Sequence, residues 1–361
     1  MYPPLQNFIR LLEKENLPRH ITILTTAGRY KLLGTFKTAH PKINILRLGQ
    51  SGPGIGKLAR LYYYFIFYAC AVLLLLFKRP ATVLYYETLS SFPAWFYKKF
   101  INRSASIMVH YHEYTSPGEY EQGMFLTRLF HRCEKWLYPR LQWLSHTNAY
   151  RMNLFLKDIY PLQPQHTAIV PNYPPSCWYT KKRFIPATPL QIVYIGSLSL
   201  QTMYTKEMAG WVLAQQGKVF WDIYSYNITD DARQYIRSLN SLWIQLKEGL
   251  DYAALPDVLV QYHIGVVLYK GHIANYVYNA PNKLFEYLSA GLQVWVPDVM
   301  TGAMEYADKI NVLAVNFDNL QSISYQSIRL STQHEKDSKQ YLCEASLEPM
   351  INYLRAGIRK K

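Results

Sequence analysis

Cysteine is scarce in this sequence. The 361 residues contain only four, far apart, at Cys70, Cys133, Cys177 and Cys343. The close pairs of a structural zinc site are missing, and so is the cysteine density of a secreted disulfide scaffold. The first residues, Met1 to Asn7, also lack the basic start and apolar core of a signal peptide. These absences favour a chain that works in a reducing cytoplasm.

Acidic residues are in the minority. The sequence has 24 Asp and Glu against 39 Lys and Arg, which gives a formal net charge of +15. Such an excess favours an anionic partner, which could be nucleic acid, a phosphate-bearing substrate or the acidic face of a membrane. The basic residues form small scattered groups, and no recognised nucleic-acid-binding module accompanies them. No nucleic acid partner is therefore expected.

A dinucleotide-binding turn is also missing. No Gly-x-Gly-x-x-Gly follows any strand-like run, and the glycines between Gly52 and Gly56 precede a helical pattern with the wrong spacing. The sequence therefore disfavours a nucleotide-dependent oxidoreductase or epimerase.

What the sequence does have is length and apolar content. Half of its residues are hydrophobic, 32 are Tyr and 8 are Trp, and 361 residues suffice for two domains. Apolar, β-branched runs alternate with stretches of helical spacing, which predicts an α/β fold with two Rossmann-like lobes of parallel strands. The runs lie at 21–25, 43–48, 82–86, 106–110, 141–145 and 167–170, and then at 191–195, 219–224, 243–246, 264–269, 293–296 and 311–315.

The predicted domains follow this alternation. A first lobe spans residues 1–171, a proline-rich and basic linker 172–189, a second lobe 190–337, and a C-terminal helix within 338–361 packs back toward the first lobe. The first lobe begins with a helix, about Leu5 to Glu15, where such lobes usually begin with a strand and a glycine-containing turn. Its first strand is therefore expected to be missing.

The apolar run from Leu61 to Phe77 resembles a membrane span. Seventeen residues of helix cover about 25 Å, less than the roughly 30 Å of a hydrocarbon core. Strand-like runs of the same predicted sheet lie on both sides, so a spanning helix would divide that sheet between compartments. The sequence leaves two alternatives, a helix buried against the sheet and a helix lying partly in a bilayer surface.

The segment from Ile264 to Pro297 reads as strand, loop, helix and strand. Pro281 suits the first turn of the helix and Gly291 its C-terminal cap. The helix N-terminus is expected at the C-terminal edge of the sheet, where its N–H groups and dipole favour a diphosphate. Glu286, about a turn and a half into the helix, could accept hydrogen bonds from two ribose hydroxyls.

This segment, Pro281-Asn282-Lys283-Leu284-Phe285-Glu286-Tyr287-Leu288-Ser289-Ala290-Gly291, resembles the GT-B glycosyltransferases of retaining family 4. The resemblance implies GT-B architecture, two Rossmann-like lobes facing a cleft, with the matching glutamate on the donor ribose and no metal. The family's second glutamate, eight positions earlier, is replaced by Tyr278, so the donor sugar must be contacted by another group. The residues expected to bind the donor are Glu286, Lys283, Asn282, Asn279, Gly196, Ser197 and Lys206.

A histidine-containing loop is expected to face the same cleft. His110-Tyr111-His112-Glu113-Tyr114 follows an apolar strand and is similar to the family's loop near the reacting centre. His112 could donate a hydrogen bond to the donor sugar or orient the acceptor hydroxyl, and Glu113 could position His112. His110 is expected to point into the sheet. His112 and Glu113 are thus the predicted catalytic residues.

The function implied is transfer of a sugar from a UDP-sugar or GDP-sugar to a saccharide or lipid-linked acceptor in surface polysaccharide synthesis. No cofactor is expected beyond this donor. The positive charge and the aromatic run favour an anionic membrane surface on the cytoplasmic side as a further partner. The alternative is a noncatalytic relative that binds sugar nucleotide or a partner enzyme.

Overall fold

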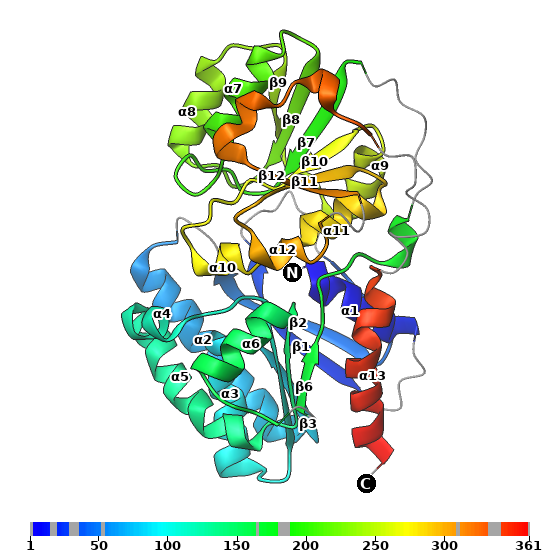
Figure 1. Cartoon of the computed structure of the whole chain (residues 1–361). Helices are drawn as coiled ribbons and strands as arrows, with labels where there is room; N and C mark the ends of the chain where they lie inside the picture. The colour runs from blue at the N-terminus through cyan, green and yellow to red at the C-terminus, as the bar shows by residue number, and fades with distance from the viewer. Residues whose placement is uncertain are drawn as a thin grey trace. The chain divides into compact units, whose positions relative to one another are not determined.

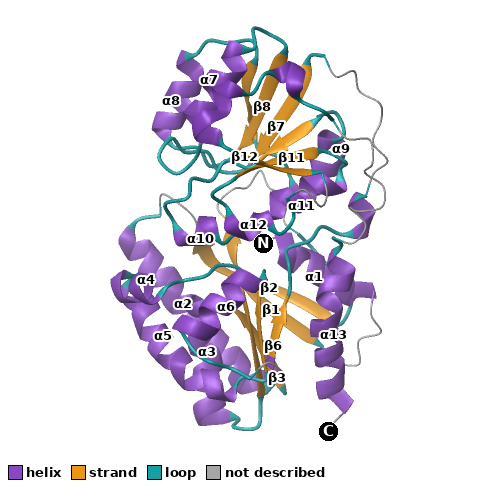
Figure 2. Cartoon of the chain, in the orientation of Figure 1, coloured by secondary structure: helices purple, strands orange, loops and turns teal. Residues whose placement is uncertain are grey.

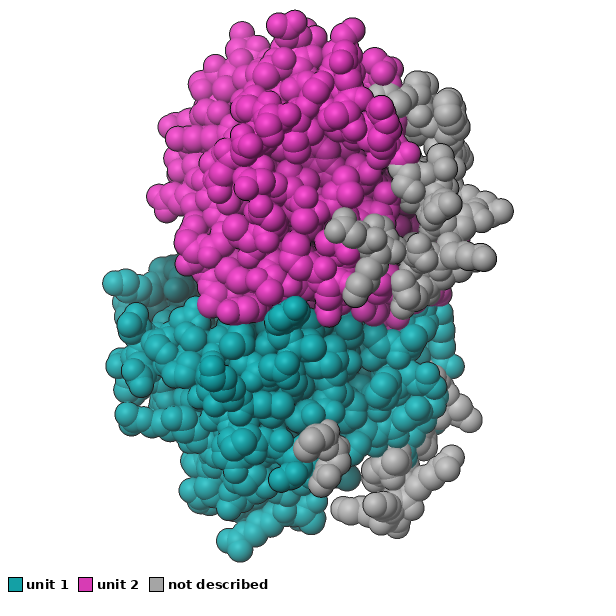
Figure 3. Space-filling view, in the orientation of Figure 1, with its two compact units in different colours: residues 1–171, 344–361 teal, residues 172–343 magenta. Residues whose placement is uncertain are grey.

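The structure is a computed structural model that describes residues 3–14, 20–28, 36–51, 55–163, 166–179, 188–307, 311–330 and 341–359. The chain forms two compact units, coloured separately in Figure 3: residues 1–171 with 344–361, and residues 172–343.

The first unit contains two groups of parallel strands and the helices that connect them (Figure 1). Its elements are α1 (Pro3–Lys14), β1 (Ile21–Gly28), β2 (Ile43–Ser51), α2 (Lys57–Lys78), β3 (Thr82–Tyr86), α3 (Ser91–Phe96), β4 (Ser106–Tyr111), α4 (Pro117–Gln122), α5 (Phe125–Leu137), β5 (Trp143–His146), α6 (Ala149–Asp158), β6 (Thr167–Ile169) and α13 (Cys343–Arg359). β1 and β2 form one parallel pair, and β3, β4, β5 and β6 form a parallel sheet in that order.

The second unit contains a single six-stranded parallel sheet. Its elements are β7 (Leu190–Ile195), α7 (Thr205–Ala214), β8 (Val219–Ser225), α8 (Asp230–Ser238), β9 (Ile244–Glu248), α9 (Leu255–Leu259), β10 (Ile264–Val266), α10 (Ala274–Val277), α11 (Asn282–Ser289), β11 (Gln293–Pro297), α12 (Thr301–Met304) and β12 (Val312–Val315). The strand order is β12-β11-β10-β7-β8-β9. The first strand of the unit, β7, therefore lies in the middle of its sheet.

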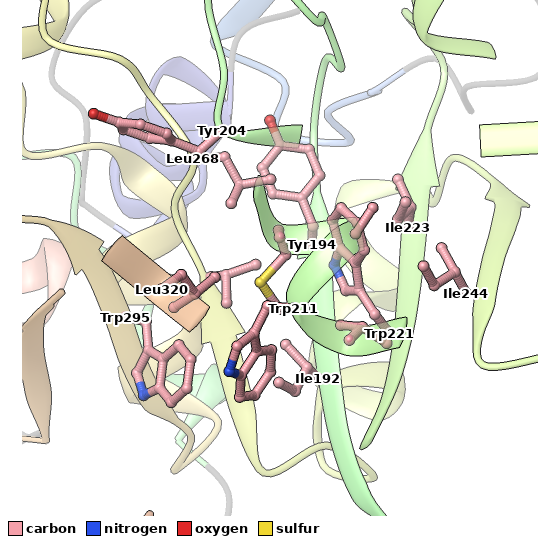
Figure 4. Close-up of a cluster of buried hydrophobic side chains, with 14 of the residues drawn as sticks. Ile192, Tyr194, Tyr204, Trp211, Trp221, Ile223, Ile244, Leu268, Trp295 and Leu320 are labelled. Carbon is pink, nitrogen blue, oxygen red and sulfur yellow. The ribbon is translucent and has the colours of Figure 1, made fainter. Parts of the chain in front are cut away.

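The core of the second unit explains why its strands read as nearly continuous apolar runs. A parallel sheet with helices on both faces buries both sets of its side chains. Trp211 of α7, Trp221 of β8 and Trp295 of β11 are almost completely buried, and Figure 4 shows them around Ile192 of β7. The predicted α/β fold with two parallel, Rossmann-like lobes is confirmed.

Some boundaries differ from the prediction. The run expected as a strand to Tyr269 is a strand only to Val266. The Val267 N–H still donates to the Trp295 carbonyl of β11 at 2.8 Å, and Val267 and Leu268 remain buried. The Leu268 carbonyl accepts instead from the Tyr204 N–H at 2.8 Å. The apolar run is therefore longer than the strand, because the residues that follow the strand are also buried.

The predicted linker is partly built into the second unit. Trp178 is 3% exposed and belongs to that unit's core, where its ring lies 4.5 Å from the ring of Tyr252. Residues 180–187, which include the basic group at 181–183, lie outside the described residues.

The α2 helix is not buried against the sheet. Within this helix, which is described throughout, only Ala71 is buried, while Leu58, Phe65 and Phe77 are 84%, 70% and 83% exposed. Of the two alternatives that the sequence left, the helix buried against the sheet is wrong. The side of α2 that contacts the rest of the unit includes Tyr68, whose ring centroid lies 4.9 Å from that of Phe130. By length and composition α2 could cross a membrane, and it is the one such helix in the described ranges.

Candidate functional site

The sheet of the second unit defines a position where a ligand can bind. Its strand order reverses direction between β7 and β10, because the chain adds β8 and β9 on one side and β11 and β12 on the other. Open parallel sheets bind ligands at the C-terminal ends of the strands at such a reversal. Gly196 follows β7 directly, and α11 follows β10 after a connection that contains the short helix α10.

Tyr287 holds α11 against the end of β7. The Ile195 N–H donates to the Tyr287 hydroxyl oxygen at 2.9 Å. The ring crosses β10 at Gly265, where an added Cβ would lie 2.2 Å from ring carbon. Pro281 is the residue before the first helical turn, not within it as predicted, and Gly291 ends the helix with φ of 74°. These contacts fix the start of α11 beside the Gly196 turn.

Lys283 reaches that turn. Its Nζ would lie 2.8 Å from a Cβ added to Gly196, whose φ of 147° also favours glycine. The ammonium lies 5.1 Å from the ring centroids of both Tyr194 and Tyr269, and it donates to the Tyr269 hydroxyl at 3.3 Å. Burial acts to lower the pKa of Lys283, but Tyr194, Tyr269 and Glu286 outweigh it and raise that pKa. The ammonium form of Lys283 is therefore favoured at the end of β7.

Glu286 is the second ionisable group of this site. It is 8% exposed, and burial raises the pKa of its carboxyl to about 7, with Lys283 acting in the opposite direction. Removing a carboxylate from water without full compensation favours the protonated form. A ligand with hydroxyl donors would stabilise the ionised form of Glu286.

The other predicted donor residues differ in position. Asn279 and Asn282, both half-buried, lie just before α11 and at its first residue. Ser197 is exposed, and its hydroxyl accepts from the Asn227 amide at 3.5 Å. Lys206 is exposed on α7, with its Nζ 5.8 Å from the Tyr235 ring of α8. The structure therefore assigns Lys283, rather than Lys206, to the Gly196 turn.

Tyr278 is held in place through its backbone. It ends α10, and a Cβ added to Gly302 would lie 2.4 Å from its carbonyl carbon and oxygen. Only glycine fits at residue 302 without moving this loop. The loop that carries Tyr278 and Asn279 is thus fixed against α12.

The two histidines of the predicted loop, His110 and His112, lie where β4 ends. His110 points into the sheet as predicted, with its Nδ1 2.8 Å from the Ser145 hydroxyl, and burial lowers its pKa well below the usual value. His112 stacks on Tyr86 with ring centroids 5.4 Å apart and lines a cavity of about 1080 Å³. Its carbonyl accepts from Arg151 and, at 3.5 Å, from the Thr147 hydroxyl.

Glu87 is a site residue that the sequence prediction missed. Its Oε1 accepts from the backbone N–H groups of His112 at 2.6 Å and Glu113 at 3.3 Å, while the Glu113 side chain is exposed. Burial raises the pKa of Glu87 to about 8. Its φ of 60° and ψ of 158° fall in a region that non-glycine residues seldom adopt. A carboxylate directly after the apolar strand 82–86 was the available signal.

Potential metal ligands do not cluster in the described part of the chain. Within the described ranges, no three His, Cys, Asp or Glu residues form a group that could hold a metal ion. The donor candidates belong to residues 172–343 and the histidine loop to residues 1–171.

Comparison with known proteins identifies the fold. No protein-family model and no curated protein matches the sequence. Sucrose-phosphate synthase from Thermosynechococcus elongatus is similar in structure, with a TM-score of 0.71 and 13% identity over 98% of this chain and 93% of that one. Anabaena HepE, solved with UDP and glucose, has a TM-score of 0.62 and 13% identity over 93% of this chain and 100% of its own.

A third similar structure is assigned to a different reaction. It is described as a UDP-N-acetylglucosamine 2-epimerase from Listeria monocytogenes, with a TM-score of 0.58 and 13% identity over 99% of this chain and 94% of that one. The chain therefore has the GT-B fold. Because proteins of this fold include one named a synthase and one named an epimerase, the reaction has to be argued from the site.

Proposed function

We propose that this protein is a glycosyltransferase that moves a sugar from a nucleoside diphosphate sugar to a saccharide or lipid-linked acceptor. The observation that carries the proposal is the meeting of Lys283, Gly196 and Glu286 at the strand-order reversal of the second unit. A glycine turn and a buried ammonium suit a diphosphate, and a buried carboxylate beside them suits the hydroxyls of a ribose.

The chemistry follows from where charge develops. When the bond between the anomeric carbon and the diphosphate breaks, negative charge grows on the leaving group, and Lys283 with the first turn of α11 stabilises it. Because a side chain supplies this positive charge, the transfer is proposed to need no metal. UDP-sugars and GDP-sugars are the proposed donors, and the reaction is proposed to retain the configuration of the anomeric carbon.

His112 and Glu113 are proposed to act on the sugar or acceptor. An imidazole can orient an attacking hydroxyl by hydrogen bonding. Glu87 is proposed as a positioning residue, because its carboxyl group holds the backbone of this loop. The structures similar to this chain include one solved with UDP and glucose, which supports a nucleotide sugar as ligand.

The acceptor is proposed to lie at the cytoplasmic face of a membrane, in surface polysaccharide synthesis. The exposed residues Leu58, Phe65 and Phe77 of α2 can enter the interface of a bilayer. Lys57, Arg60, Lys78 and Arg79 at its two ends can contact anionic lipid headgroups.

A noncatalytic protein of the same fold is the second candidate. Tyr278 in place of an acidic residue, together with the divided sheet of the first unit, favours it. Such a protein would bind sugar nucleotide without turnover.

Calorimetry tests the main proposal. UDP, GDP and their common sugar conjugates are titrated into the wild type, Glu286→Ala and the control Glu248→Ala, which changes an exposed glutamate of β9. We expect one nucleotide to bind the wild type and the control and to lose affinity for Glu286→Ala. Release of nucleoside diphosphate with an acceptor extract, but not without it, then indicates transfer. Binding without turnover favours the noncatalytic protein, and epimerised free donor would contradict transfer.

A further inference from the structure

The cavity of about 1080 Å³ in the first unit has the form of a slot between two strands. Among the described strands, β1 pairs only with β2 and β3 pairs only with β4. Every residue from His20 to Thr26 and from Thr82 to Tyr86 lines the cavity. Because side chains alternate between the two faces of a strand, consecutive lining residues mean that the cavity runs along the strand edges. We call this cavity the slot.

The second unit shows what occupies the equivalent position in a complete sheet. There the first strand, β7, separates β8 and β9 on one side from β10, β11 and β12 on the other. In the first unit, β1 and β2 lie on one side of the slot and β3 to β6 on the other. The slot therefore has the place of β7, and with a strand in it the sheet would have the doubly wound order of the second unit.

The helix α1 lies where the connection from such a strand would run. Parallel strands are joined by right-handed crossovers, so steps in opposite directions along a sheet place their helices on opposite faces. Figure 2 shows α3, α5 and α6, which follow β3, β4 and β5, on one side of the strands and α1 on the other. Leu5, Phe8 and Leu12 of α1 line the slot, and the chain continues from α1 into β1. A strand before α1 would thus complete a β-α-β unit with β1.

We propose that the slot receives a parallel β-strand carried by the same polypeptide on the amino-terminal side of α1. The proposed strand is mainly apolar on both faces, because α1 lines one side of the slot and Phe67, Leu74 and Leu75 of α2 also line it. One inserted strand places β1 and β3 about 10 Å apart, twice the spacing of neighbouring strands. The turn after this strand reaches the end of the slot that Glu87 and His112 line.

A strand explains the slot better than a small ligand does. The volume lies near the upper end of ligand pockets, which are roughly 300–1,000 Å³. However, two parallel strand edges carry alternating N–H and C=O groups that only another extended backbone can satisfy along their whole length. The position of α1 also favours a strand from the same chain, because α1 lies where the connection from that strand to β1 would run.

The first test is the amino terminus of the protein in its native cells, read by mass spectrometry of the N-terminal peptide. The proposal predicts a start upstream of Met1, with a mainly apolar run of about five to seven residues and a glycine-containing turn before α1. A native chain that starts at Met1 overturns the proposal.

The second test is hydrogen exchange of the chain with and without that natural segment. We expect the amides of β1 and β3 to gain at least tenfold protection when the segment is present, while β8 and β10, which flank β7, stay unchanged. A control segment of equal length with prolines at consecutive positions lacks N–H donors on both edges, cannot pair with β1 and β3, and should give no protection.

Equal protection of β1, β3, β8 and β10 in the chain that starts at Met1 would overturn the proposal. Native mass spectrometry then identifies the alternative, since a bound small molecule adds its mass and a second copy doubles it. Protection that depends on the natural segment supports the proposal whether or not the protein transfers sugar, so the two proposals can fail separately.

Discussion

The Lys283 ammonium lies between two phenol rings, with the Gly196 backbone at one side of it. Replacing Lys283 with alanine removes the buried positive charge that we propose binds the diphosphate. Hydrogen bonds to charged groups contribute about 1.5–3 kcal/mol, so Lys283→Ala should weaken nucleotide diphosphate binding roughly ten- to hundredfold. Titration calorimetry measures this. Lys206→Ala is the matched control, and an equal loss in both variants would contradict the assignment.

Glu286 makes the stability of the second unit depend on pH. Its pKa of about 7 in the folded state lies above the ordinary value of 4.5. The carboxyl therefore favours folding below pH 4.5, and this contribution is lost as pH rises through about 7. Glu286→Gln should gain stability relative to the wild type between pH 5 and pH 8, by up to about 3 kcal/mol.

Urea unfolding of the second unit at several pH values measures this difference. Glu248→Gln, which changes an exposed glutamate, should show no pH-dependent difference from the wild type. A difference between wild type and Glu286→Gln that is constant from pH 5 to pH 8 would mean that Glu286 titrates normally. Bound nucleotide should lower the pKa of Glu286, because ribose hydroxyls donate to the ionised carboxylate.

At the scale of one element, α2 presents an unusual amount of apolar surface. Replacing Leu58, Phe65 and Phe77 with serine should abolish co-sedimentation with anionic vesicles at low salt, because these side chains would enter the bilayer interface. Leu242→Ser is the control, since Leu242 of the second unit is 81% exposed. Binding of the wild type should fall as salt increases. If the triple variant sediments like the wild type, α2 is not the membrane contact.

The α11 helix depends on its contact with β10. Gly265→Ala would place a Cβ 2.2 Å from the Tyr287 ring, which should cost about 1–3 kcal/mol or more and weaken nucleotide binding. Tyr287→Phe should cost about 1–3 kcal/mol because it leaves the Ile195 N–H without its acceptor. Chemical unfolding and calorimetry measure both effects. Gly210→Ala in α7 is the control, because a Cβ added there would lie at an ordinary contact distance, and it should be neutral or stabilising. If Gly210→Ala also destabilises the protein, the close contact with Tyr287 is not the cause of the loss in Gly265→Ala.

At the scale of the whole molecule, the two units should respond differently to nucleotide. The proposed ribose and diphosphate contacts all belong to residues 172–343. A ligand at a hundred times its dissociation constant stabilises by about 2.7 kcal/mol. Hydrogen exchange should therefore show slower opening of β7, β10 and α11, with little change in β3 and β4. Equal slowing in both units would place the nucleotide contacts in both.

The sequence by itself determined the parallel α/β architecture and the position of Glu286. Apolar, β-branched runs separated by helical stretches leave few other ways to bury both faces of a sheet, and a proline and a glycine bound the helix that carries Glu286. The helix before the first strand-like run also indicated the irregular start of the first unit. These features are local, so their physical cause is visible in neighbouring residues.

Only the tertiary structure decided which distant groups meet. Lys283 and Gly196 are separated by more than eighty positions, and they meet because β10 pairs with β7 across the strand-order reversal. Glu87 contacts the His112 loop because β3 and β4 are neighbours, and α2 is exposed because only one of its sides contacts the unit. The slot likewise depends on which strands pair. Strand pairing is a long-range choice of hydrogen-bond partners, and no local pattern of residues fixes it.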